Sequence, residues 1–167
     1  MKRLLFFIYL FSSFKLNAQS KYIGHYHDFF GSFVDINTDS TFEYTYHFDL
    51  SGSWTKGKWS VNNDTLYFKM IPVYDTLNYI DSFTKSHIVK LVLSGDEKSN
   101  TITYDESAIN GLSSDGQNYC SYPMELFYKD DKLFSIEKNG KLLKRKVKRF
   151  WSKEKFVPWF VKKKDKN

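Results

Sequence analysis

The chain is poor in the residues that cross-link or interrupt secondary structure. It has 167 residues, among them one cysteine, three prolines and eight glycines. The single cysteine, Cys120, excludes an intrachain disulfide, so a hydrophobic core has to hold the fold together. No apolar run of about 18 residues follows the N-terminus, which argues against a protein with several membrane-spanning helices. Aromatic side chains, in contrast, make up 19% of the sequence.

Local catalytic motifs are also missing. The sequence has no Gly-x-Ser-x-Gly turn, no glycine-rich phosphate loop and no His-Glu-x-x-His metal motif. We therefore expect a protein that is not an enzyme and that uses no cofactor. An enzyme remains the second alternative, because a site assembled from distant residues leaves no local motif.

Two short groups of polar residues have the spacing of partial metal sites. His25 and His27 would share one face of a strand, but one cysteine and four histidines fall short of the usual zinc ligand sets. Asp35, Asn37 and Asp39 begin like a calcium loop that lacks its glycine and its closing glutamate. We expect turns and solvent-facing side chains at both places, and no metal.

The first 18 residues have the pattern of a secretory signal. Lys2 and Arg3 precede an apolar run from Leu4 to Phe14, and the segment ends in the small residue Ala18. The pattern predicts cleavage after Ala18 and export to the periplasm or the extracellular space. Because Cys120 lies far from that point, we do not expect a lipoprotein. The alternative is an uncleaved N-terminal anchor.

After the signal peptide, the sequence repeats short runs that alternate apolar and polar residues or are rich in β-branched and aromatic residues. Polar turns separate these runs. They predict an all-β fold in which an antiparallel meander forms an eight-stranded barrel or a related sandwich. We expect strands at residues 22–28, 32–36, 41–48, 56–61, 65–71, 86–93, 100–104, 119–128 and 132–138. Residues 72–83 resist assignment, and residues 105–118 have the composition of a long loop.

The turns also predict strand register. A two-residue turn at Asn63-Asp64 pairs Trp59 with Phe68, and Val61 with Leu66 on the same face. Asn139-Gly140 predicts a second two-residue turn.

A third hairpin is constrained by which side chains share a face. Residues 34 and 36 join the aromatic face of the next strand, residues 42 to 48, only if the connecting loop has an odd number of residues. We therefore expect a loop of three or five residues there.

Three segments form a recognisable set: Gly24-His25-Tyr26, residues 35–44 and residues 57–66. In these segments the chain resembles the small lipocalin-like domains exported by Gram-negative bacteria. Those domains typically have an opening Gly-x-Trp, an acidic turn before a Thr-Phe strand, and a Gly-x-Trp strand followed by Asp-Thr-Leu. The resemblance covers about residues 22–70, and Tyr26 stands where that family usually has tryptophan. It implies an eight-stranded antiparallel barrel or related sandwich and no particular activity.

Aromatic residues on inward strand faces are the candidate ligand-binding residues. They are Tyr44, Tyr46, Trp59 and Phe68. They would line a cavity for one small apolar ligand or fill the barrel completely. We favour filling, because an eight-stranded barrel is barely wide enough for its own side chains.

The formal charge of +6 is unevenly distributed. Residues 19–137 carry nine Lys and Arg against 17 Asp and Glu, whereas residues 138–167 carry 13 against two. We divide the chain into a signal peptide (1–18), a lipocalin-like β domain (19–149) and a basic aromatic C-terminal tail (150–167). The spacing in residues 142–149 fits an amphipathic helix or a strand, and we favour the strand.

The tail suggests a second kind of partner. Its candidate contacts with an anionic membrane or polymer are Phe156, Trp159, Phe160, Lys162, Lys163 and Lys164. The alternative, which we favour slightly, is that the aromatic residues cap the barrel and the lysines are only solvated. Export makes nucleic acid a poor partner, and we expect none.

The leading hypothesis is thus an exported, non-enzymatic lipocalin-like barrel of unknown specific function, which either binds a small apolar ligand or serves as an interaction module of the cell envelope. The first alternative is a peripheral interaction module of the cell envelope.

Overall fold

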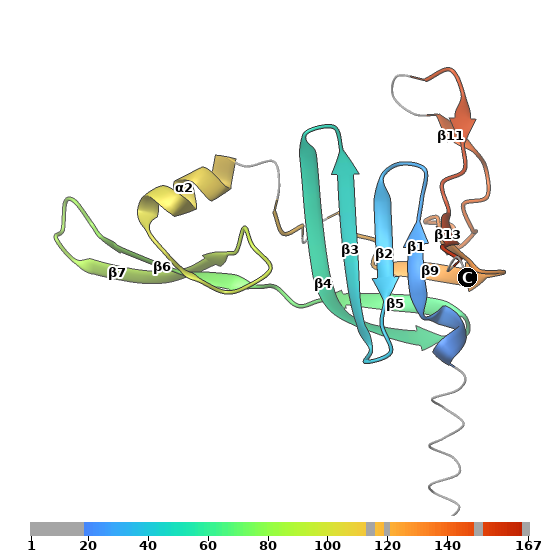
Figure 1. The fold of residues 1–167 in the computed structure, drawn as a ribbon, viewed down its shortest axis with the longest axis horizontal. Helices are drawn as coiled ribbons and strands as arrows, with labels where there is room; N and C mark the ends of the chain where they lie inside the picture. The colour runs from blue at the N-terminus through green and yellow to red at the C-terminus, as the bar shows by residue number, and fades with distance from the viewer. Residues whose placement is uncertain (1–18, 113–115, 119–120, 149–151, 165–167) are drawn as a thin grey trace, which may run out of the picture.

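The computed structural model describes residues 19–112, 116–118, 121–148 and 152–164. At its centre is a closed barrel with the strand order β1-β13-β10-β9-β5-β4-β3-β2, in which every pair of neighbours is antiparallel (Figure 1). The expected all-β class and eight-stranded barrel are therefore confirmed. The signal at 1–18 and Cys120 lie outside the described residues and stay predictions.

The barrel is an up-and-down meander with two insertions. A short 3-10 turn, η1 (Ser20–Tyr22), precedes it. Its strands are β1 (Gly24–His27), β2 (Ser32–Ile36), β3 (Thr41–Phe48), β4 (Ser51–Asn62), β5 (Thr65–Met70), β9 (Glu125–Lys129), β10 (Lys132–Ser135) and β13 (Phe160–Lys162). Closure comes from β13, which pairs with β10 on one side and with β1 on the other.

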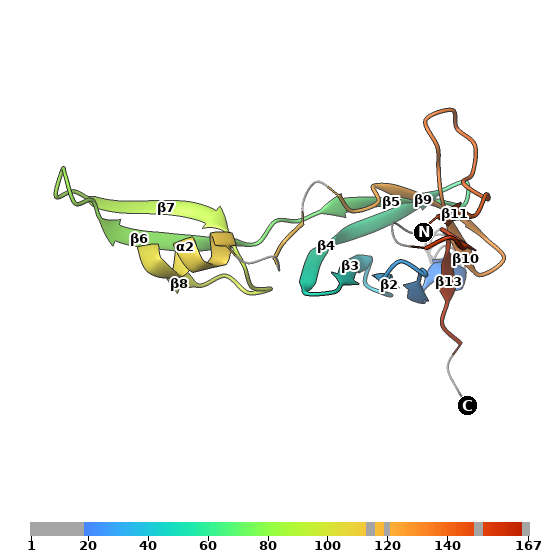
Figure 2. The same ribbon diagram turned by 90° about the horizontal axis from the view of Figure 1, so that it is seen from above.

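The larger insertion leaves the barrel between β5 and β9. It contains β6 (Tyr74–Ile80), β7 (His87–Leu93), β8 (Thr101–Ile102) and the helix α2 (Tyr104–Leu112). Its three strands form a separate sheet in the order β7-β6-β8. We call residues 74–112 the arm, because they project away from the barrel (Figures 1 and 2). A smaller insertion between β10 and β13 holds a hairpin of β11 (Val147–Lys148) and β12 (Lys155–Phe156).

The hairpin between β4 and β5 has the predicted register. Trp59 pairs with Phe68, and Val61 pairs with Leu66. Both turn residues, Asn63 and Asp64, have positive φ, at 48° and 60°, as a two-residue primed turn requires. The prediction succeeded because turn length and side-chain alternation together leave one register that buries the apolar face.

The loop between β2 and β3 also has the predicted odd length. The Asn37 N–H donates to the Thr41 carbonyl at 3.0 Å, which closes a three-residue loop and pairs Ile36 with Phe42. The turn at residues 139–140 differs from the prediction. The Glu137 N–H donates to the Lys141 carbonyl at 2.8 Å around three residues, with Gly140 at φ 78°.

Parts of the two segments without predicted strands form regular elements of the arm. Residues 74–80 form β6, and the expected long loop at 105–118 begins with the nine-residue helix α2. A capping box starts this helix: the Thr103 N–H donates to the Glu106 carboxylate at 2.7 Å, and the Glu106 N–H donates to the Thr103 hydroxyl at 3.4 Å. The pattern Thr-x-x-Glu is a known sequence signal for the start of a helix, so this helix start could have been predicted.

The boundary placed at residue 149 is wrong, because the barrel continues beyond it. Residues 147–148 belong to the small hairpin, and the last barrel strand is Phe160–Lys162. This three-residue strand was assigned to a tail because it lies in a segment, residues 138–167, that carries 13 Lys and Arg against two Asp and Glu. In the barrel, Phe160 is 5% exposed and pairs with Leu133. The burial of this side chain therefore makes the segment a barrel strand and not part of a tail.

Candidate functional site

The four candidate ligand-binding residues are part of the barrel core. Tyr44, Trp59 and Phe68 are between 5% and 7% exposed, and Tyr46 packs against them from a partly buried position. The Tyr44 hydroxyl donates to Ser32 Oγ at 3.3 Å, and Trp59 Nε1 donates to the Asn37 carbonyl at 3.0 Å. Burial raises the pKa of Tyr44, so its hydroxyl stays protonated. This packing fits the filled core that the sequence analysis favoured.

The candidate membrane contacts are divided between the barrel and solvent. Phe156 stacks on Phe29 with ring centres 4.2 Å apart, Trp159 lies 5.5 Å from the Phe134 ring, and Phe160 is buried. Phe160 as a membrane contact is therefore wrong, since it holds the barrel closed.

The lysines of the same group differ in their contacts. Lys162 Nζ lies 5.8 Å from the centre of the Tyr26 ring and donates to the Lys21 carbonyl at 3.2 Å. The side chains of Lys163 and Lys164 lie at the surface. These two lysines remain available to an anionic surface.

The histidine pair lies on the outer face of the barrel. His25 Nδ1 is 2.7 Å from Asp35 Oδ1, and an open depression of about 310 Å³ adjoins both residues. Within the described residues, no three His, Cys, Asp or Glu side chains are grouped so as to hold a metal ion.

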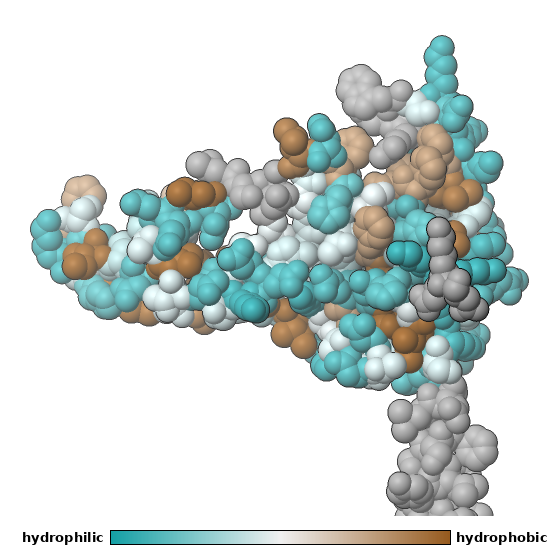
Figure 3. All heavy atoms as spheres, viewed as in Figure 1, coloured by the Kyte–Doolittle hydropathy of each residue, from teal (hydrophilic) through white to brown (hydrophobic). Residues whose placement is uncertain are grey.

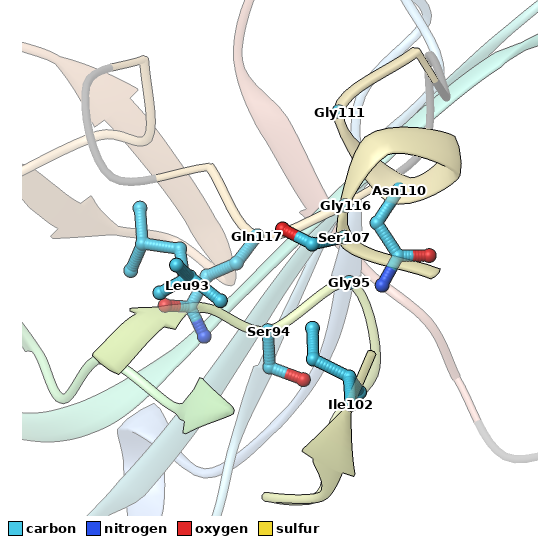
Figure 4. A pocket seen from close by; sticks show the side chains of 10 residues that line it. Leu93, Ser94, Gly95, Ile102, Ser107, Asn110, Gly111, Gly116 and Gln117 are labelled. Atoms are coloured by element: carbon cyan, nitrogen blue, oxygen red, sulfur yellow. The ribbon is translucent and has the colours of Figure 1, made fainter. Parts of the chain in front are cut away.

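A pocket of about 330 Å³ lies where the arm meets the barrel (Figure 4). Its lining includes the apolar residues Leu93 and Ile102 and the polar residues Ser94, Ser107, Asn110 and Gln117. Gln117 Oε1 accepts the Val73 N–H at 3.1 Å, whereas its buried Nε2 has no hydrogen-bond partner in the described part of the chain. The pocket thus combines an apolar wall with polar side chains, and Gln117 Nε2 is a buried donor next to it.

Strand β4 fixes this junction. The Trp54 N–H donates to the Gly116 carbonyl at 3.0 Å, and Trp54 Nε1 donates to the Gly95 carbonyl at 3.4 Å. Lys56, also on β4, forms an ion pair with Glu97 of the arm. These bonds connect the base of the arm to a barrel strand at several points.

The arm sheet has one covered face and one open face. Helix α2 covers the first, where Leu77 is 2% exposed and Tyr79 lies 5.4 Å from the Tyr104 ring. On the opposite face, register places residues 74, 76, 78 and 80 of β6 beside residues 93, 91, 89 and 87 of β7. The large apolar side chains there are exposed: Tyr74, Ile80, Val89, Leu91 and Leu93. Figure 3 shows hydrophobic (brown) residues at the surface of the arm.

Strand β7 is also an edge strand, since β6 is its one partner in the described residues. At the two ends of the hairpin, the Ser94 N–H donates to the Val73 carbonyl at 3.0 Å and the Asp81 N–H donates to the Ser86 carbonyl at 2.9 Å. Antiparallel ladders alternate, so residues 88, 90 and 92 bond to β6. The N–H and C=O groups of His87, Val89, Leu91 and Leu93 therefore point to the free edge, the long side of the arm marked β7 in Figure 2.

The predicted strand at residues 86–93 is present as β7, but its exposed edge was not predicted. Residues 87–93 read His-Ile-Val-Lys-Leu-Val-Leu, which is apolar on both faces. A run of this kind indicates a strand that is covered on both faces of its sheet. In the structure the side chains of Val89 and Leu91 are exposed on one face, and the described residues leave one edge of the strand unpaired.

The shifted carboxyl groups belong to turns and caps. The pKa of Asp39 is lowered by hydrogen bonds from Thr41, that of Asp81 by hydrogen bonds from Thr84, and that of Glu106 by hydrogen bonds from Thr103. Asp64 has a lowered pKa because Lys21 and Tyr22 bond to it. Each of these carboxylates holds a loop, a helix start or the η1 turn in place.

Comparisons with known proteins leave the chain without an assigned family: no family model, no curated protein and no solved structure matches it. No helix in the described ranges is both long and apolar enough to cross a membrane.

Proposed function

We propose that the protein is an exported, non-enzymatic binding module in which the barrel is a scaffold and the arm binds a partner protein. The partner supplies an extended segment that adds to the sheet beside β7. The pattern of residues 1–18 supports export.

One observation carries this proposal: β7 combines exposed apolar side chains with unpaired backbone groups on the same residues. Val89 and Leu91 are 58% and 67% exposed, and their N–H and C=O groups face the free edge. An added strand satisfies these groups with main-chain hydrogen bonds, while its side chains extend the apolar face. Natural edge strands are usually covered or protected by charges, and in the described residues β7 is uncovered and carries one charge, Lys90.

The packing of the barrel supports placing the binding surface outside it. Leu66, Leu126 and Leu133 have no exposed surface, and Tyr26 is 1% exposed. Interiors packed in this way leave little room for a ligand. The non-enzymatic part of the proposal is supported by the carboxylates with lowered pKa, each of which bonds to residues that form a turn or a helix start.

Selection of random nine-residue peptides displayed on phage tests this function. The purified protein is the bait, and a Val89→Pro variant is the comparison. Proline removes an N–H that faces the free edge, so the β6–β7 hydrogen bonds persist. We expect enriched peptides to bind the variant at least about tenfold more weakly, the loss expected when several main-chain bonds fail.

A second variant guards against misfolding of the first. Leu91→Lys leaves the backbone unchanged and places a charge on the open face, and it should weaken the same peptides. Phe33→Lys, at an exposed position of the barrel, is the matched control and should leave them unaffected. Enriched peptides that bind all four proteins equally, or no enrichment on the wild type, would contradict the proposal.

A further inference from the structure

We infer that the strand recognised by β7 carries a carboxylate directly opposite Lys90. This inference rests on the proposed function and specifies the chemistry of the partner. It follows from the surroundings of Lys90 and from what happens when two copies of β7 are paired.

Lys90 is the single charged residue of β7, and it lies at the centre of the strand. Its side chain is on the face of the sheet that also carries Leu77 and Tyr79, and Lys90 Nζ lies 6.0 Å from the centre of the Tyr79 ring. It takes part in none of the ion pairs formed by the described residues. An exposed ammonium group is therefore available at the middle of the edge.

A second copy of the chain is a poor occupant of this edge. Two-fold antiparallel pairing that uses all four outward-facing residues sets Val89 opposite Leu91 and His87 opposite Leu93. The same register sets Lys90 opposite Lys90, at a position where Cα atoms are only about 4.5 Å apart. Like charges placed directly opposite are destabilising, and a central lysine is a common means of preventing edge-to-edge pairing.

The same geometry favours an acidic partner. A residue opposite Lys90 shares its face, and the residues before and after it lie beside Val89 and Leu91 on the open face. The recognised segment thus has a carboxylate between two apolar residues. The ion pair between Lys90 and this carboxylate fixes the register of the partner strand on β7. Sliding the partner by two residues would move the carboxylate opposite Ile88 or Val92.

Two labelled peptides test this inference. One is Thr-Val-Thr-Val-Glu-Val-Thr-Val-Thr, and the other has Lys in place of Glu. Fluorescence anisotropy measures the affinity of each for the wild type, for Lys90→Glu and for Lys98→Glu, which makes the same charge change elsewhere on the arm. The wild type and Lys98→Glu should prefer the Glu peptide by roughly three- to tenfold, and Lys90→Glu should reverse the preference.

The outcomes separate the inference from the function on which it rests. Equal binding of both peptides, lost in Val89→Pro, would refute the acidic partner and leave strand addition standing. Failure of both peptides to bind the wild type would count against both. Sedimentation velocity of the wild type should show a monomer; a dimer that Val89→Pro dissociates would make a second copy the occupant and overturn the inference.

Discussion

At the scale of single residues, close backbone approach limits what the barrel accepts. Gly57 is the clearest case, because a Cβ atom there would lie 2.1 Å from the Lys69 carbonyl oxygen and 2.8 Å from the Phe42 ring. The contact with Lys69 is to backbone of the paired strand β5, which cannot move without disturbing the ladder. Glycine at this position is therefore required by packing, whatever its role in the sequence resemblance.

Gly57→Ala is expected to lower the free energy of unfolding by roughly 1–3 kcal/mol, the usual cost of an added methyl group in a packed site. Thermal and denaturant unfolding measure the change. Gly111→Ala is the control: nothing lies within 4 Å of its added methyl, so its effect should stay within about 1 kcal/mol. Equal effects of the two substitutions would contradict the role given to Gly57.

At the scale of secondary-structure elements, a strand or helix could be predicted from the sequence when residues close to it in the chain fix its position. The β4–β5 hairpin was predicted correctly because Asn63-Asp64 and the alternation on either side fix both turn and register. Helix α2 was missed because its composition resembles a loop, although Thr103 and Glu106 mark its start. Strand β13 was missed for another reason: three residues carry too little pattern, and only pairing with β1 and β10 makes them a strand.

The start of α2 should depend on pH through Glu106. Hydrogen bonds from Thr103 lower its folded pKa below the ordinary 4.5, so the capping contribution is complete above pH 4.5 and is lost as the pH falls through the lower folded value. Thr103→Ala removes the hydroxyl bond and keeps the N–H bond, so it should move the Glu106 pKa part of the way back toward 4.5 and speed amide exchange in α2. Nuclear magnetic resonance titration and hydrogen exchange measure both effects.

Thr103→Ser is the conservative control, since it keeps a hydroxyl and an N–H at the same position. It should leave the pKa of Glu106 low. An unchanged Glu106 pKa in Thr103→Ala would mean that the Thr103 N–H, which alanine keeps, holds the carboxylate ionised without help from the hydroxyl.

At the scale of the whole molecule, the two ends of the described chain close the barrel together. β1 follows the η1 turn, and β13 reaches it after the small hairpin, so the first and last strands are paired. The Lys163 N–H adds a bond to the His25 carbonyl at 2.7 Å. Basic residues near the C-terminus are therefore partly structural.

Two truncated chains test whether β13 is needed to close the barrel. A chain ending at Lys148 lacks β13 and the buried Phe160 side chain, and we expect it to lose cooperative thermal unfolding. A chain ending at Lys164 keeps the strand and should unfold like the full chain. Near-ultraviolet circular dichroism follows both. A folded protein from the shorter chain would show that β13 is dispensable.

The sequence by itself determined the all-β class, an eight-stranded barrel or related sandwich, and the register around two hairpins, because turn chemistry and alternation act over a few residues. Tertiary structure alone decided that residues 160–162 close the barrel, since their burial depends on partners more than 20 residues away. It also decided which apolar residues are core and which are surface. Leu77 and Leu91 look alike in sequence, but α2 covers one face of the arm sheet and leaves the other open. Exposure of β7 is therefore a property of the fold, and the proposed function rests on it.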